Sequence, residues 1–147
     1  MIRFLKIWDV KSPERANNED SGIDLFIPDS FKSVDMKIWD SVLIPSWIRF
    51  IIKNWYDWVF KNKSGIALKK GLQVWACVID SSYRWEVHIH LTKITGDDIT
   101  LNPWDKIVQM IVRKVELDQP EEITEEEFNK ESKTDRWIWG FGSTGVV

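Results

Sequence analysis

The sequence predicts an all-β fold, a sandwich or barrel built from short strands. Apolar runs of strand character are short and are separated by Gly, Pro, Asn, Asp and Ser. No stretch before Glu121 repeats its apolar residues with the period of an amphipathic helix. The 147 residues, 44% hydrophobic and 29% charged, suit one domain that is large enough to form its own core.

The expected strands follow one another through the first third of the chain. Residues 2–8 alternate loosely and predict a first strand, and residues 11–20 are polar and predict a loop. Residues 21–28 predict a short strand that is opened by glycine and closed by proline. Residues 42–45 and 48–52 predict two more strands, with a turn between them.

A β-hairpin is expected in the middle of the chain. Residues 74–79 are apolar, turn residues follow at 80–82, and residues 86–91 alternate. His88 and His90 share one face of the second arm; a polar sheet face is favoured over a metal site because no third ligand follows. Asp80 ends the first arm, where a fixed carboxylate can orient a water, and Tyr83 can cover a flat ligand.

Two further segments carry candidate phosphate ligands. Lys63 and Ser64 precede Gly65, and a cation and a hydroxyl beside a small residue suit an approaching phosphate oxygen; the alternative is a surface turn. Gln109 stands inside the apolar run 107–112, which predicts another strand. If buried, its amide needs a hydrogen-bond partner; otherwise it faces solvent.

The character of the chain changes after residue 115. We expect a β core over residues 1–115 and an acidic arm with a glycine-rich tail over residues 116–147. Thr124 and Glu127 can form a capping box for a short helix that ends near Lys130.

The tail contains the sharpest local motif, Gly-Phe-Gly-Ser-Thr-Gly at residues 140–145. Its glycines, Ser143 and Thr144 can wrap phosphates, Arg136 adds a positive charge, and Phe141 can stack on a base. The motif is not a Walker loop, because no Gly-Lys-Ser/Thr follows a strand.

Composition excludes several classes. The net charge is −3 and no continuous stripe of Lys and Arg is present, which argues against direct nucleic-acid binding. No apolar run approaches the ~20 residues of a membrane span, and residues 1–8 do not form a signal peptide. Cys77 is the single cysteine, so no disulfide can form within the chain and a cytoplasmic location is expected.

Five segments together resemble the five motifs of the trimeric dUTP diphosphatases (dUTPases), in the same order and at compatible spacing. These segments are residues 21–28, 62–67, 71–87, 104–109 and 140–145. The resemblance covers nearly the whole chain. It implies a distorted β jelly roll of the β-clip type and a homotrimer with active sites between subunits, over which the tail closes.

The resemblance also implies a reaction, hydrolysis of dUTP to dUMP and pyrophosphate with Mg²⁺. Asp80 would be the general base that activates the attacking water, and Asp24 would hold the magnesium through its water shell. Tyr83 would pack against the deoxyribose and exclude ribose, while the hairpin backbone would read the uracil. Lys63 replaces the more usual arginine and lacks its bidentate fork. The substrate-binding residues implied in this way are Lys63, Ser64, Gly65, Val74, Trp75, Cys77, Tyr83, Gln109, Arg136, Phe141, Gly142, Ser143 and Thr144.

Two alternatives remain open at this point. A dCTP deaminase-like enzyme has the same fold, but the hairpin and the tail motif both favour the diphosphatase. A catalytically impaired relative that binds the nucleotide is the other alternative. Release of pyrophosphate from dUTP would indicate the diphosphatase, and release of ammonia from dCTP would indicate the deaminase-like enzyme. Binding of dUTP without turnover would indicate the impaired relative.

The chain has ten tryptophans against seven glycines. Six of them fall where the family typically has glycine, and three more stand at turn-like places. We therefore expect glycine at most or all ten positions of the natural protein, through UGA codons that its source reads as glycine. Written with tryptophan, the sites near Trp75, Trp85, Trp137 and Trp139 would be crowded. The first six are Trp47, Trp75, Trp85, Trp104, Trp137 and Trp139, and the other three are Trp39, Trp55 and Trp58.

Overall fold

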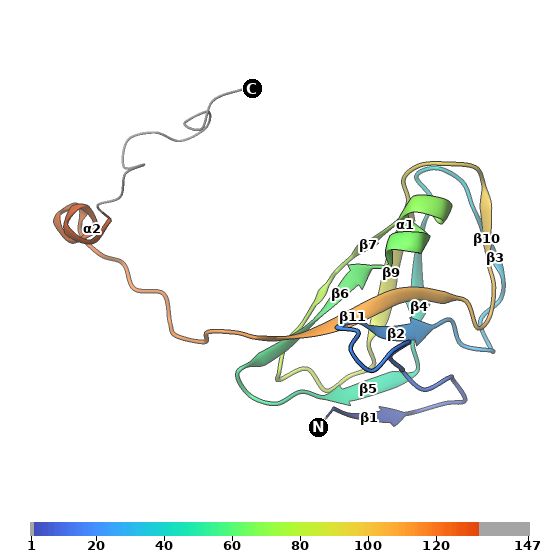
Figure 1. Ribbon diagram of the computed structural model, residues 1–147, viewed down its shortest axis with the longest axis horizontal. Helices are drawn as coiled ribbons and strands as arrows, with labels where there is room; N and C mark the ends of the chain where they lie inside the picture. Colours follow the sequence, from blue (N-terminus) through green and yellow to red (C-terminus); the bar gives the residue numbers. More distant parts are fainter. Residues whose placement is uncertain (1, 133–147) are drawn as a thin grey trace. The chain divides into compact units, whose positions relative to one another are not determined.

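A computed structural model describes residues 2–132 of the chain. Contacts divide the chain into two parts, Met1–Glu116 and Leu117–Val147. The first part consists of strands and one short helix, as expected for an all-β fold (Figure 1). Within the described range, no helix has the length and apolar character needed to cross a membrane.

The strands of the first part pair in four antiparallel groups. A four-stranded sheet has the order β2-β11-β6-β8, and a three-stranded sheet has the order β4-β9-β7. Two smaller pairs are β1 with β5 and β3 with β10. The strands are β1 (Arg3–Lys6), β2 (Ile23–Phe26), β3 (Val34–Met36), β4 (Ser41–Pro45), β5 (Ile48–Ile51), β6 (Tyr56–Asn62), β7 (Leu72–Trp75), β8 (Val78–Ile79), β9 (His88–Lys93), β10 (Ile99–Leu101) and β11 (Lys106–Lys114).

The core lies between the apolar faces of these sheets. Leu25, Phe60 and Ile89 are fully buried in one continuous apolar cluster. Successive side chains of a strand point to opposite faces, so β9 buries Ile89 and Leu91 and turns its two histidines away from the core. The predicted polar face of this strand is therefore confirmed.

The middle of the chain departs from the predicted hairpin in one respect. Residues 74–79 do not form one strand, because Ala76 has a φ of 51° and turns the chain between β7 and β8. β7 pairs with β9 as the two arms should, with Trp75 opposite His90. β8 instead crosses to the larger sheet and pairs with β6.

Four elements were not predicted, namely the short strands β3 and β10, strand β6 and helix α1. β6 occupies a stretch in which Trp55 and Trp58 had indicated turns, yet its central residues 57–60 are buried. Helix α1 (Ser64–Lys70) follows directly, where a turn was expected. Seven residues with none of them buried are too few to give a helical repeat of apolar positions.

In the second part, helix α2 (Glu125–Glu131) confirms the predicted capping box. The Thr124 side chain accepts a hydrogen bond from the backbone N–H of Glu127, and Glu127 accepts from the backbone N–H of Thr124 at 2.8 Å. This backbone hydrogen bond lowers the pKa of the Glu127 carboxyl. The cap explains why a helix begins in so polar a segment.

Gly71 ends α1 in the left-handed region and gives a testable prediction. Its φ is +61°, and a Cβ added there would lie 1.8 Å from the backbone oxygen of Thr95. We expect Gly71→Ala to destabilise the fold by more than about 3 kcal/mol, measured by urea unfolding, because the strained φ adds to a clash with backbone. Gly65→Ala is the matched control in the same helix, since no atom lies within 4 Å of its added Cβ. Equal stability of the two variants would contradict this account.

Candidate functional site

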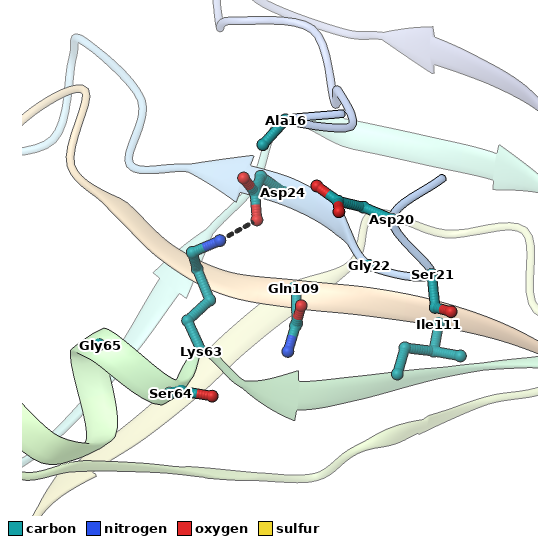
Figure 2. A pocket seen from close by; sticks show the side chains of 10 residues that line it. All are labelled: Ala16, Asp20, Ser21, Gly22, Asp24, Lys63, Ser64, Gly65, Gln109 and Ile111. Atoms are coloured by element: carbon teal, nitrogen blue, oxygen red, sulfur yellow. Dashed lines mark hydrogen bonds and ion pairs between the residues drawn. The ribbon is translucent and has the colours of Figure 1, made fainter. Parts of the chain in front are cut away.

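A cavity of about 400 Å³ brings three of the predicted segments together (Figure 2). Strand pairing explains the convergence, because Gln109 on β11 lies opposite Asp24 on β2 and opposite Lys61 on β6. β6 then delivers Lys63 and Ser64 to the same place, at the start of α1. The lining residues are Ala16, Asp20, Ser21, Gly22, Asp24, Lys63, Ser64, Gly65, Gln109 and Ile111.

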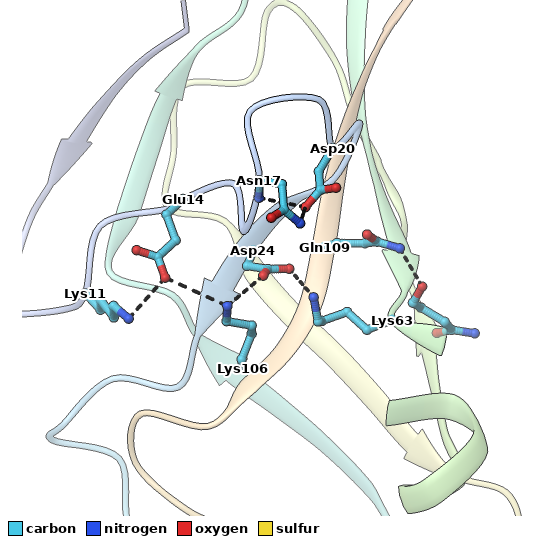
Figure 3. Close-up of polar contacts among 9 residues, drawn as sticks. Lys11, Glu14, Asn17, Asp20, Asp24, Lys63, Lys106 and Gln109 are labelled. Carbon is cyan, nitrogen blue, oxygen red and sulfur yellow. Dashed lines mark hydrogen bonds and ion pairs between the residues drawn. The ribbon is translucent and has the colours of Figure 1, made fainter. Parts of the chain in front are cut away.

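Asp24 is the electrostatic centre of this cavity. Its carboxylate is 3% exposed and accepts hydrogen bonds from the ammonium groups of Lys63 and, at 2.9 Å, Lys106 (Figure 3). A buried carboxylate needs such partners. The hydrogen bond to Asp24 raises the pKa of Lys106. Lys106 therefore stays positively charged at neutral pH. The Lys63 side chain itself lines the cavity.

Gln109 has the hydrogen-bond partner that its position in an apolar run required. Its Nε2 donates to the backbone oxygen of Asn62 at 2.9 Å, and its half-buried side chain lines the cavity. Gly22 makes room for it, because a Cβ at Gly22 would lie 2.1 Å from Oε1 of Gln109. This amide is thus held in the cavity by β6 on one side and a glycine on the other.

A second cavity, of about 240 Å³, lies on the hairpin. The hydroxyl of Tyr83 donates to the backbone oxygen of Glu86 at 2.8 Å, and the Tyr83 ring meets Trp85 edge to face at 5.6 Å. Asp80 is exposed at the end of β8, and its backbone oxygen accepts from the N–H of Tyr83. The lining residues are Leu43, Phe60, Ala76, Val78, Ile79, Tyr83, Val87 and His88.

The remaining predicted residues have different surroundings. The Val74 side chain is buried in the core, and its N–H donates to Oδ1 of Asn62 at 2.8 Å. Trp75 is half exposed, and the Cys77 thiol points to the backbone oxygen of Val74. The five predicted residues of the tail lie outside the described residues. They are Arg136, Phe141, Gly142, Ser143 and Thr144.

The two cavities have no lining residue in common. Tyr83 therefore lines one cavity, beside which Asp80 is exposed at the end of β8, and the candidate phosphate ligands line the other.

The carboxylates of the first cavity can accept a hydrated cation. Asp20 and Asp24 line it, but across residues 2–132 no three His, Cys, Asp or Glu side chains gather as a metal site. Mg²⁺ is commonly held in this way, by one or two carboxylates together with water and substrate phosphates. The donor set fits that mode of binding and not a closed protein cage.

Sequence reasoning missed Asp20 and Lys106 as neighbours of this site. Asp20 organises the preceding loop by accepting from the backbone N–H of Asn17 at 2.8 Å. Lys106 reaches Asp24 from the first residue of β11, beside a shift in the pairing register with β2. Such a shift changes which side chains face each other and leaves no mark in the local sequence.

A family profile and the curated relatives of this chain both point to one protein family. The profile of the dUTPase family matches residues 9–145. A deoxyuridine 5'-triphosphate nucleotidohydrolase from Clostridium acetobutylicum is 34% identical over 148 residues, covering 99% of this chain and 97% of that protein. An enzyme of the same name from Rickettsia felis is 30% identical, covering 99% of this chain and 95% of its own.

Solved structures share the fold. A dUTPase variant from Staphylococcus bacteriophage 80alpha, solved with dUpNHpp, has a TM-score of 0.79 at 20% identity and covers 99% of both chains. A mutant dUTPase from phage phi11 of S. aureus, with a coordinated structural Mg(II) ion, has a TM-score of 0.75 at 17% identity. It covers 87% of this chain and 99% of its own.

Proposed function

Because this chain belongs to the dUTPase family and is a dUTP nucleotidohydrolase, we propose that its two cavities bind the two ends of dUTP. The observation that carries this assignment is the convergence of Lys63, Ser64 and Gln109 on one cavity beside the buried Asp24. The fold is the dUTPase jelly roll.

The first cavity receives the triphosphate. The ammonium of Lys63 turns from Asp24 towards a phosphate oxygen, while Lys106 continues to neutralise that carboxylate. The Ser64 hydroxyl and the Gln109 amide add hydrogen bonds to phosphate oxygens. A cation and two neutral donors suit a group that carries several negative charges.

Asp20 and Asp24 are the carboxylates of the described part that line this cavity. Asp24 would hold a bound Mg²⁺ through water, with the triphosphate supplying the direct ligands. The ion would supply positive charge to the phosphate oxygens.

The hairpin cavity receives deoxyuridine. The Tyr83 ring packs against the sugar, where the extra hydroxyl of ribose would clash, and the hairpin backbone around Trp75 and Cys77 contacts the uracil edge. The largely apolar lining is suited to a flat base and a sugar.

Asp80 activates the water that attacks the α-phosphorus in line. The water oxygen forms a bond to that phosphorus, and the bond from the α-phosphorus to the oxygen bridging the α- and β-phosphates breaks. The water proton passes to Asp80, and pyrophosphate leaves. Donors around the phosphates stabilise the charge that develops on their oxygens.

The enzyme works as a homotrimer with each site shared between subunits. Its support is the resemblance of the five motifs to those of the trimeric dUTPases, together with the absence of any lining residue shared by the two cavities. A neighbouring subunit supplies the hairpin with Asp80, and the tail of a third, residues 136–147, closes over the nucleotide. We place this activity in the cytoplasm, where it keeps uracil out of DNA by removing dUTP.

Product analysis tests the proposed function. Protein purified from its source, incubated with Mg²⁺ and dUTP, should release pyrophosphate and dUMP, and dCTP should give no ammonia. Ammonia from dCTP would favour the deaminase-like alternative. Tight binding of dUTP with no turnover would favour the impaired relative.

Gly22→Ala tests the role given to Gln109. The new methyl group should push the Gln109 amide out of the cavity, lowering kcat/KM for dUTP about 10–100-fold through loss of a hydrogen bond to charged phosphate. The melting temperature should change little, because the group that moves is the end of a flexible side chain. Combining Gly22→Ala with Gln109→Ala should be no worse than Gln109→Ala alone. If the loss of kcat/KM in the double variant equals the product of the losses in the two single variants, Gly22 does not act through Gln109.

A further inference from the structure

Tryptophan is concentrated at backbone positions that favour glycine. Five non-glycine residues of the described part have positive φ, and four of the five are tryptophan. The values are 76° at Trp39, 55° at Trp47, 68° at Trp55 and 69° at Trp104. Gly71 and Gly96 have φ values of 61° and 79°, in the same range. An L-residue with a side chain is strained in this region, and glycine is not.

Hydrogen bonds to distant segments fix the backbone at each of these four positions. The N–H of Trp39 donates to Lys93 at 2.7 Å, and that of Trp104 donates to Ile27 at 2.8 Å. The carbonyl of Trp55 accepts from Val115 at 3.0 Å. The carbonyl of Trp47 accepts from Ile7 at 2.9 Å, and its N–H donates to the Glu86 carboxylate at 2.8 Å. The chain cannot relax φ without breaking contacts between elements.

Three of the four indole rings do not compensate for this strain, whereas the half-buried ring of Trp47 packs against the core. Trp39 is 75% exposed, and Trp55 and Trp104 are 48% and 44% exposed. Trp104 donates one exposed hydrogen bond to Asp29, and the half-buried Trp47 packs against Trp8 at a ring distance of 6.2 Å. Three of the four side chains thus leave much of their apolar surface in water, where a large apolar ring gains little.

We propose that the functional protein carries glycine at positions 39, 47, 55 and 104, and that one codon, UGA, stands at these positions in the gene. If the source cell translates UGA as glycine, one property of its genetic code accounts for all four tryptophans. Four independent substitutions of glycine by tryptophan are then not needed. UGA is the codon proposed for these four positions because different genetic codes translate it differently. The assignment rests on backbone conformation and does not depend on the proposed reaction.

A positive φ distinguishes these four tryptophans from the others of the described part. Trp8, Trp58, Trp75 and Trp85 are absent from the positive-φ residues. Trp58 is 2% exposed and packs on Phe50 with ring centroids 4.4 Å apart, so its backbone and packing set no requirement for glycine. The expectation of glycine at most or all ten positions thus gains structural support at four of them.

The codons decide the proposal first. UGA at positions 39, 47, 55 and 104, with glycine in the peptides of the protein purified from its source, supports it. UGG at these positions, or tryptophan in those peptides, overturns it.

Thermal unfolding gives an independent test on recombinant chains at equal concentration. The quadruple variant Trp39→Gly, Trp47→Gly, Trp55→Gly, Trp104→Gly should melt roughly 10–25 °C above the chain as written. The same four positions changed to Ala keep a Cβ and should recover clearly less. Trp8→Gly with Trp85→Gly, both at exposed positions of ordinary φ, should give no increase. A quadruple glycine variant that melts no higher than the alanine set overturns the proposal.

Discussion

Asp80→Asn is expected to bind dUTP and to hydrolyse it about 10²–10⁴-fold more slowly than its parent chain. Asparagine keeps the size of the side chain and its hydrogen bonding but cannot take a proton from water. Because Asp80 is exposed at the end of β8 and its side chain supports no other element, the melting temperature should not change. Single-turnover hydrolysis and dUTP binding, measured on the same sample, separate the chemical step from binding.

Asp98→Asn is the matched control, since Asp98 is another exposed aspartate next to the end of a strand, directly before β10. It should leave hydrolysis unchanged. Normal turnover by Asp80→Asn would remove Asp80 from the role of general base, and a fall in dUTP binding equal to the fall in rate would make it a binding residue.

Deletion of residues 136–147 is expected to remove most turnover and to leave the assembly intact. The deleted tail contains Arg136, Phe141, Ser143 and Thr144, which together supply one cation, two hydroxyls and an aromatic ring for the bound nucleotide. The core elements all precede Leu117, so subunit association should survive. Size-exclusion chromatography with light scattering checks the mass, and pyrophosphate release checks the activity.

A shorter deletion of residues 146–147 controls for the loss of chain length alone and should retain activity. Full turnover by the longer deletion would refute the role of the tail. Dissociation into monomers would show that these residues act in assembly instead.

The strands that sequence reasoning found are those with strong local signals. The run that became β11 and the alternation of β9 carry their burial pattern in adjacent residues. β6 was missed because Trp55 and Trp58 suggested turns, whereas Trp58 is buried in the core. Residues 74–79 were assigned to one strand because apolar runs do not show where a positive φ at Ala76 will redirect the chain.

The candidate site could be predicted only in part, because the local sequence does not show which distant residues the sheet brings together. The types of its ligands, Lys63, Ser64 and Gln109, are visible in the sequence, and the sheet brings them to one cavity. The pairing of Asp24 with Lys106 depends on a register shift in β11, which is a long-range property of the sheet. The glycine that holds space for Gln109 likewise becomes evident only from the three-dimensional contact.

The separation of the two cavities has a consequence for mixtures of inactive chains. In the proposed trimer, a site takes its hairpin from one subunit and its tail from another. Asp80→Asn chains have an intact tail, and chains lacking residues 136–147 have an intact hairpin. If the two variants are unfolded together in equal amounts and refolded, random assembly leaves roughly a quarter of the sites with both parts. Two variants that each retain little activity should therefore yield a mixture that hydrolyses dUTP much faster than either variant alone.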